Sequence, residues 1–149
     1  MVWALVNSWT FSINVAQVDF TGLAGYSDVR VLVRAVTLAG SGQRALRVST
    51  DNGSTFLSTS GDYVFCAGTG VETNATSMSM HTTASASARS CEVEICGFNL
   101  TAPKVAQILT RTDFRTVVIP TASALNAVRV YDTTGSTNLT GGSIYLYAR

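Results

Sequence analysis

Charged side chains are scarce in this chain of 149 residues, at 13% of the sequence, roughly half the fraction of an ordinary soluble domain. Lysine occurs once, glutamate three times, and the formal net charge is +1. A nucleic-acid-binding surface would need a dense basic stripe with aromatic residues between, whereas the nine arginines are scattered. The composition therefore argues against nucleic-acid binding, and the shortage of helix-forming residues argues against a helical fold.

Catalytic chemistry also lacks its usual residues. The single histidine, His81, removes most transition-metal sites and the basis for Ser-His-Asp catalysis, and no Gly-x-Ser-x-Gly, Walker or dinucleotide-binding motif occurs. Glu92 and Glu94 could form a hydrolase pair. Two residues apart on one strand, however, they point the same way rather than flank a substrate, which favours a solvated face. We therefore expect no enzyme activity, cofactor or metal site, with a hydrolase using these glutamates as a remote third possibility.

Targeting and membrane segments are missing as well. The first residues lack the basic region and the long apolar run of a signal peptide. No stretch approaches the ~20 apolar residues of a membrane-spanning helix. The expectation is a protein made in a cytoplasm, without membrane association.

Short polar side chains are abundant instead: 20 threonines, 16 serines and 12 glycines accompany 46% hydrophobic residues. Such residues suit two-sided β-surfaces and subunit interfaces, where a charge is costly to desolvate. Alternating segments between turn residues predict about nine or ten short strands in one domain. The expected fold class is all-β, an antiparallel sandwich of jelly-roll type, with residues 1–8 as an N-terminal arm and 9–149 as the β-domain.

The strongest local signal lies in residues 46–57. Leu46 and Val48 alternate with polar residues, Asp51-Asn-Gly-Ser follows, and a second extended run begins at Thr55. Asn-Gly supplies the positive φ angles of a tight turn, so the pattern predicts a β-hairpin.

Three other segments give definite expectations. Residues 9–15 alternate as a half-buried strand, and residues 104–109 are the only stretch with helical character. In the long strand expected at 29–38, strict alternation places Ala35 on the face of Val29, Val31 and Val33, and Val36 on the opposite face with Arg30, Leu32 and Arg34.

The three cysteines, Cys66, Cys91 and Cys96, are odd in number, so at least one is free or pairs between chains. Cys91 and Cys96 lie on opposite faces of an expected strand and about 17 Å apart, too far for a bond. If Val93 and Ile95 face the core, Cys91 does too, and Cys96 lies on the outer face. Three reduced thiols are the simplest interpretation. The sharper hypothesis is that Cys96 cross-links neighbouring subunits.

Most of the 2 tryptophans, 5 tyrosines and 6 phenylalanines should lie in the core. Trp3 precedes the first clear strand, which makes it the best candidate for contact with a partner. Trp9 begins that strand and is the second candidate for docking. The same aromatic side chains could stack on sugars, although nothing in the sequence selects that use.

Four segments follow one another in a familiar order: Phe20-Thr-Gly-Leu-Ala-Gly-Tyr with the long Val/Arg strand after it, Leu46-Arg-Val-Ser-Thr-Asp-Asn-Gly-Ser-Thr-Phe, Gly61-Asp-Tyr and the closing Gly141-Gly-Ser-Ile-Tyr-Leu-Tyr-Ala-Arg. In this order they resemble a family of tailed-bacteriophage virion proteins, which appear as tail-fibre, head-fibre or decoration-type modules. The resemblance covers most of the chain, with residues 67–90 least matched. It implies a jelly-roll fold, usually trimeric, without enzymatic activity, and it transfers no binding residue.

The expected function is that of a non-enzymatic virion structural protein, an oligomeric β-module with a trimer favoured. It would act in assembly, decoration or host attachment at the tail, collar or capsid surface, with other virion proteins as partners and the N-terminal arm as the docking element. Its location would be the virion, after synthesis in the host cytoplasm. The alternative is a carbohydrate-binding module that recognises host surface glycans through an aromatic platform.

Overall fold

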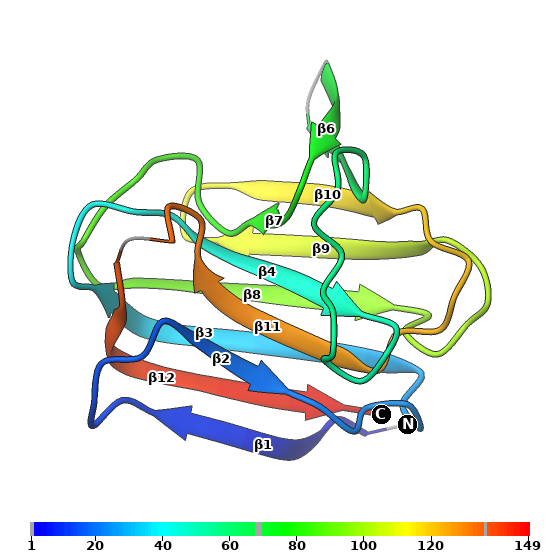
Figure 1. Ribbon diagram of the computed structural model, residues 1–149, viewed down its shortest axis with the longest axis horizontal. Helices are drawn as coiled ribbons and strands as arrows, with labels where there is room; N and C mark the ends of the chain where they lie inside the picture. Colours follow the sequence, from blue (N-terminus) through cyan, green and yellow to red (C-terminus); the bar gives the residue numbers. More distant parts are fainter. Residues whose placement is uncertain (1, 68–69, 136) are drawn as a thin grey trace.

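The computed structural model describes residues 2–67, 70–135 and 137–149, and these residues form twelve β-strands and no helix. The strands make two antiparallel sheets that lie face to face (Figure 1). In hydrogen-bonded order, the large sheet contains β1 (Ala4–Thr10), β12 (Leu139–Ala148), β3 (Asp28–Leu38), β8 (Arg89–Cys96), β9 (Lys104–Thr110), β10 (Phe114–Ile119), β5 (Tyr63–Ala67) and β6 (Gly70–Ala75). The small sheet contains β2 (Gln17–Phe20), β11 (Ala127–Asp132), β4 (Arg44–Ser49) and β7 (Met78–Ser79).

The chain crosses repeatedly between the sheets, since β1 and β3 belong to the large sheet and β2 and β4 to the small one. Apolar side chains from both sheets meet between them, and Val31, Val93 and Ile108 of the large sheet are fully buried, as are Leu46 and Val130 of the small sheet. Along β8 burial alternates residue by residue, as the two-residue period of a strand requires. The predicted antiparallel sandwich of jelly-roll type is confirmed, with twelve strands among the described residues.

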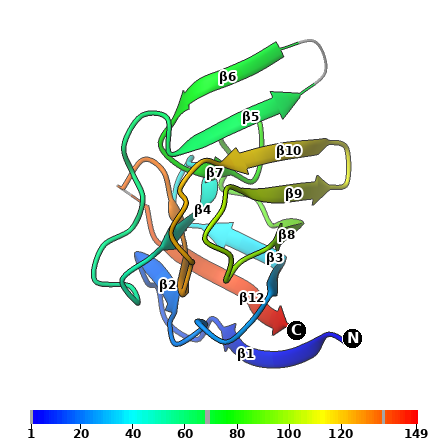
Figure 2. The same ribbon diagram turned by 90° about the vertical axis from the view of Figure 1, so that its right-hand side faces the viewer.

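The large sheet extends beyond the small one at both ends. At one end lies β1, all seven residues of which are exposed. At the other end the β5–β6 hairpin projects away from the body of the sandwich (Figures 1 and 2). The four strands of the small sheet therefore cover only the middle of the inner face.

The N-terminal segment differs from its expectation. Residues 4–8, expected within a free arm, belong to β1, which pairs antiparallel with β12 from Ala4 opposite Ala148 to Thr10 opposite Ser143. The strand expected at 9–15 is wrong in its extent, because β1 ends at Thr10 and Val15 keeps only an isolated bridge to Leu139. The available edge of β12 satisfies the backbone of the earlier residues, and this pairing outweighs the local alternation.

Residues 104–109, the one short stretch with helical possibilities in the sequence, form no helix and instead make β9 between β8 and β10. Two neighbouring strands supply hydrogen bonds along its whole length. Lys104 is buried at the start of β9, where its ammonium group donates to the carbonyl of Thr121 at 3.0 Å and to that of Ser123. A short amphipathic signal gives way to tertiary pairing in this position.

The turn predicted at 51–54 forms, with φ angles of 60° at Asn52 and 88° at Gly53, but no strand follows it. The Asp51 carboxylate instead accepts hydrogen bonds from the hydroxyl and the N–H of Thr55, at 2.6 and 2.8 Å, which lower the pKa of Asp51 to about 2. The chain curls away, and β4 pairs with β11 and β7. The predicted hairpin is therefore wrong, although its turn is right.

A bulge interrupts the long strand β3. Ala35 has a φ of 51°, and the register with β8 shifts between Val33 and Val36. Val36 consequently faces the core and Ala35 is exposed, the reverse of the strict alternation expected. Gly142 of β12 lies opposite, where a Cβ atom would stand 2.4 Å from the carbonyl oxygen of Ala35. Close approach of these two backbones requires a glycine.

Candidate functional site

The outer face of the large sheet, the side turned away from the small sheet, has no layer of structure covering it among the described residues. Leu109, on β9, and Phe114, on β10, are exposed on it at 53% and 56%. Cross-strand pairing joins them into one row, since Phe114 lies opposite Leu109, Leu109 opposite Glu92, Glu92 opposite Leu32, and Leu32 opposite Tyr145. The row is apolar apart from one glutamate, so the sheet presents hydrophobic side chains on both of its faces.

The charges near the centre of the outer face are paired within the chain. Arg30 on β3 contacts Glu92 at 3.1 Å and Glu94 at 2.7 Å, both on β8. The prediction that the two glutamates share one face is therefore confirmed. Both carboxylates approach the same guanidinium, which neutralises part of their charge.

Trp3 lies against this face between two guanidinium groups. The centre of its ring is 4.4 Å from Arg30 and 4.6 Å from Arg149, distances at which cation–π attraction operates. Arg149 in turn donates to Asp28 at 2.9 Å. Burial alone would raise the pKa of Asp28, but hydrogen bonds from the Gly97 N–H and from Arg149 outweigh it and hold that pKa below its ordinary value. Trp3 is thus fixed on the sheet and half-buried rather than projecting from an arm.

Trp9 lies on the opposite side of the same sheet. It pairs with Ile144, whose side chain is buried in the core, and so it faces inward at the uncovered end of the sandwich. Its side chain remains 38% exposed and meets Phe11 edge-on, with 6.5 Å between ring centres. The structure therefore does not bring Trp3 and Trp9 together, and the two candidates for docking belong to different surfaces.

The cysteines occupy the faces that the alternation predicted. Cys91 is buried, and burial raises the pKa of its thiol to about 12. Cys96 is exposed on the outer face, with its sulfur 3.9 Å from Glu94, and burial together with that carboxylate raises its pKa. Cys66 of β5 is exposed too, with its backbone partner Thr116 on β10. All three are free thiols in the single chain, and the cross-link through Cys96 stays a prediction.

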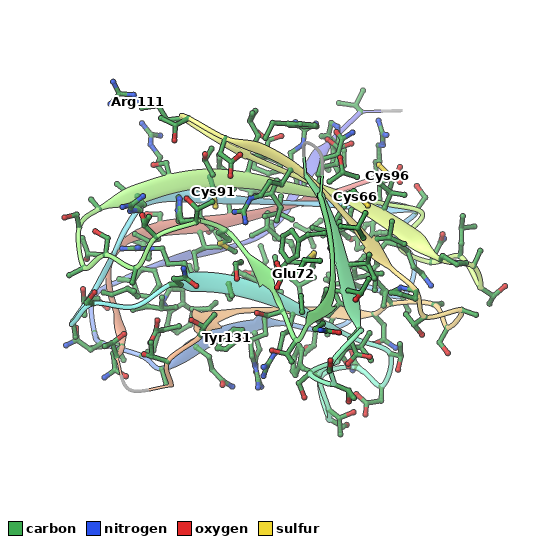
Figure 3. The ribbon with its side chains drawn as sticks, turned by 90° about the horizontal axis from the view of Figure 1, so that it is seen from above. Cys66, Glu72, Cys91, Cys96, Arg111 and Tyr131 are labelled. Atoms are coloured by element: carbon green, nitrogen blue, oxygen red, sulfur yellow. The ribbon has the colours of Figure 1, made fainter. Side chains whose placement is uncertain are left out.

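A second surface feature is a groove between the β5–β6 hairpin and the small sheet. Two adjoining cavities of about 300 and 370 Å³ share Phe65, Glu72 and Arg115 in their walls. Glu72 of β6 and Tyr131 of β11, both labelled in Figure 3, line the groove. Arg47 stacks on the Tyr131 ring at 4.7 Å. Sequence analysis missed this groove, because its residues come from strands far apart in the chain and no motif links them.

Residues 2–67, 70–135 and 137–149 contain neither a metal-binding cluster nor a membrane-spanning helix. Within these ranges no group of three or more His, Cys, Asp or Glu side chains is placed to hold a metal ion. The same ranges contain no helix long and apolar enough to cross a membrane.

Neither a family model nor a curated protein sequence matches this chain. Among solved structures, it is similar to CG-16, a homodimeric agglutinin from chicken liver, at 12% identity and a TM-score of 0.43, covering 87% of this chain and 98% of that one. Scytalido-glutamic peptidase shows 10% identity and a TM-score of 0.40, covering 90% and 75%. An alginate lyase from Alteromonas shows 8% identity and a TM-score of 0.37, covering 89% and 75%. Similarity at this level carries no information about activity, ligands or partners.

Proposed function

We propose that this protein is a non-enzymatic structural component of a tailed-phage virion, and that it assembles with further copies of itself through the outer face of the large sheet, as a trimer. The apolar row that crosses this face is the observation that carries the proposal. Apolar side chains gathered on an exposed sheet face are typical of contact surfaces. The sequence resemblance to phage virion modules supports the same role.

The charges on the outer face fit burial in an assembly. Because Arg30 is already paired with Glu92 and Glu94, covering the face does not require an unpaired charge to be desolvated. Leu5 of β1 and Val105 of β9, exposed at 54% and 42%, extend the apolar surface toward two of its edges. A closed ring of copies would cover these side chains and leave no unpaired apolar surface.

The mass of the purified protein in solution tests the assembly. Light scattering during size-exclusion chromatography should give three times the chain mass. Leu109→Asp and Phe114→Asp should each weaken association at least tenfold, because each places a charge in the apolar row. Ile13→Asp is the matched control, since Ile13 is equally apolar and 64% exposed but lies in the bend between β1 and β2.

Two outcomes would overturn the proposal. A monomer at high micromolar concentration would remove the assembly. Particles of the encoding phage whose composition and shape do not change when the gene is deleted would remove the virion role.

A carbohydrate-binding module is the second candidate, and the groove between β5–β6 and the small sheet favours it. Aromatic rings beside polar and charged side chains are the usual lining of a sugar site. Tyr131→Ala, read on a glycan array, tests this candidate, with Tyr26→Ala as the control outside the groove. Sugar binding that survives dissociation into monomers and is lost in Tyr131→Ala would favour the module over the structural role.

A further inference from the structure

A third cavity, of about 470 Å³, lies where residues 81–90 meet the turn between β9 and β10. Residues that carry hydroxyl groups form much of its wall, among them Ser87, Ser90 and Thr112. Among the described residues, no aspartate or glutamate lines it. Its volume falls within the range of small-molecule sites, and its lining is polar and free of negative charge.

Two arginines, Arg89 and Arg111, line the cavity. Arg89 donates to the hydroxyl of Thr83 at 3.3 Å, and Arg111 lies at the edge of the molecule in Figure 3. Within the described part of the chain neither forms a salt bridge, whereas Arg30, Arg115, Arg129 and Arg149 all do. A guanidinium without a carboxylate partner is free to bind an anion through two parallel hydrogen bonds.

A third arginine fixes the wall of the cavity. Arg44 is fully buried, and its guanidinium donates to the carbonyls of Val36 at 2.9 Å, Ser85 at 3.1 Å and Ser87 at 2.6 Å. These bonds hold the irregular segment 85–87 against the core in one conformation. Arg44 also adds to the positive potential behind the cavity, and the nearby Asp132 carboxylate offsets part of it.

The only histidine, His81, completes the lining and lacks a partner. His81 is only 6% exposed. Its Nε2 atom is buried and forms no hydrogen bond to any described residue. Buried polar atoms are nearly always hydrogen-bonded, and His81 belongs to the wall of the cavity, so a ligand that reaches into this wall would supply the missing bond. Burial, together with the charges of Arg89, Arg44 and Arg115, lowers the pKa of His81 to about 4, which leaves a neutral ring at pH 7.

We propose that this cavity binds an acidic sugar, with Arg89 and Arg111 contacting its carboxylate and His81 forming a hydrogen bond with the ligand. The volume is far larger than an inorganic phosphate needs, and the hydroxyl-rich wall matches the donors and acceptors of a sugar ring. The site is separate from the outer face and from the groove beside β6. It does not depend on the proposed virion role, because ligand binding and assembly are measured separately.

Calorimetric titration of the full chain tests the site with glucuronate, galacturonate and N-acetylneuraminate. Glucose, which lacks the carboxylate, and inorganic phosphate, which lacks the sugar ring, are titrated separately for comparison. At least one acidic sugar should bind saturably and at least tenfold more tightly than either. The absence of saturable binding by all three acids, or equal affinity for phosphate, would overturn the proposal.

Four variants locate the binding. Arg89→Gln and Arg111→Gln should each weaken it at least tenfold, while Arg129→Gln removes the same charge from the small sheet and should leave it within twofold. Equal losses of affinity in the three arginine variants would show that only the overall charge of the protein matters, and would overturn the proposal. His81→Phe keeps an aromatic ring of similar size and should weaken binding while the melting temperature holds or rises. Unchanged affinity in His81→Phe would contradict the role of the histidine, and circular dichroism establishes that each variant folds.

Discussion

The two faces of the large sheet differ in what explains their apolar residues. On the inner face of β9, Ile108 is fully buried under the small sheet, as the core requires. On the outer face, the next residue, Leu109, is equally hydrophobic and 53% exposed. On β8 the contrast is the ordinary one, with Val93 inside and Glu92 outside. Leu109 adds nothing to the core and is what the proposed assembly would cover, so β9 and β10 carry the argument for that proposal.

The largest expected effect comes from exchanging the inner residue. Ile108→Ala should lower the free energy of unfolding by about 2–5 kcal/mol, because it opens a cavity in the core. Leu109→Ala, one residue along the same strand, should change the stability of the isolated chain by about 0.5 kcal/mol or less. Urea unfolding of both variants at a protein concentration that keeps the chain monomeric measures the difference. Equal losses would mean that both faces are buried within one chain.

The buried side chain of His81 extends the comparison to the pH dependence of stability. The pKa of this residue is lowered from 6.5 to about 4 in the folded chain, mainly by burial and then by nearby arginines. The unfolded chain therefore binds more protons between these values, and stability should fall as the pH drops from 6.5 toward 4 and then level off for this group. The loss is at most about 3 kcal/mol.

Unfolding by urea between pH 4 and 7 measures this loss. His81→Phe serves as the comparison, because its stability should lack that component of the pH dependence. Identical pH profiles for the two proteins would contradict a dry environment for the imidazole ring.

The reactivity of the cysteine thiols gives a chemical comparison of the two faces. Cys91 inside should resist a thiol reagent until the protein unfolds, because its thiol is buried and its pKa is raised to about 12. Cys66 and Cys96, exposed on the outer face, should both react in the native state, and assembly through that face should slow them. Mass spectrometry after timed labelling counts the modified residues. If Cys91 reacted as fast as Cys96, the inner face would not be closed.

A non-reducing gel of the assembled protein extends the comparison to Cys96 itself. A dimer band that disappears with reductant and is absent in Cys96→Ser would support the interchain cross-link. Monomer bands that are unchanged by reductant would end that hypothesis.

The sequence predicted the face of each residue well wherever a strand was regular. Alternation correctly placed Cys91 and Cys96 on opposite sides of β8. The alternation failed at Ala35, because a bulge adds one residue and reverses the faces of the residues that follow. No side chain in that segment predicts the bulge. The alternation failed again after Asp51, where a side-chain hydrogen bond to Thr55 decides the path of the chain.

The candidate sites were less accessible to sequence analysis for a related reason. Glu72 and Tyr131 line one groove, and His81 and Arg111 line one cavity, although each pair is widely separated in the chain. Only the packing of the two sheets and their loops brings them together. The pairing of Trp3 with Arg30 and Arg149 depends likewise on β1 and β12 lying side by side at the sheet edge.

The smallest expected effect concerns the charges of the outer face. Glu92→Gln removes one of the two carboxylates beside Arg30 and leaves Glu94 in place at 2.7 Å. Because these side chains are partly exposed, the change should cost less than about 1 kcal/mol in the monomer. Urea unfolding at low and high protein concentration measures it, with Glu72→Gln in the groove as the control. A loss of stability that grows with protein concentration for Glu92→Gln alone would show that assembly covers Arg30 and desolvates its remaining partner. A loss above about 2 kcal/mol at every concentration would instead place these charges in a buried environment within one chain. That outcome would remove the distinction between the two faces.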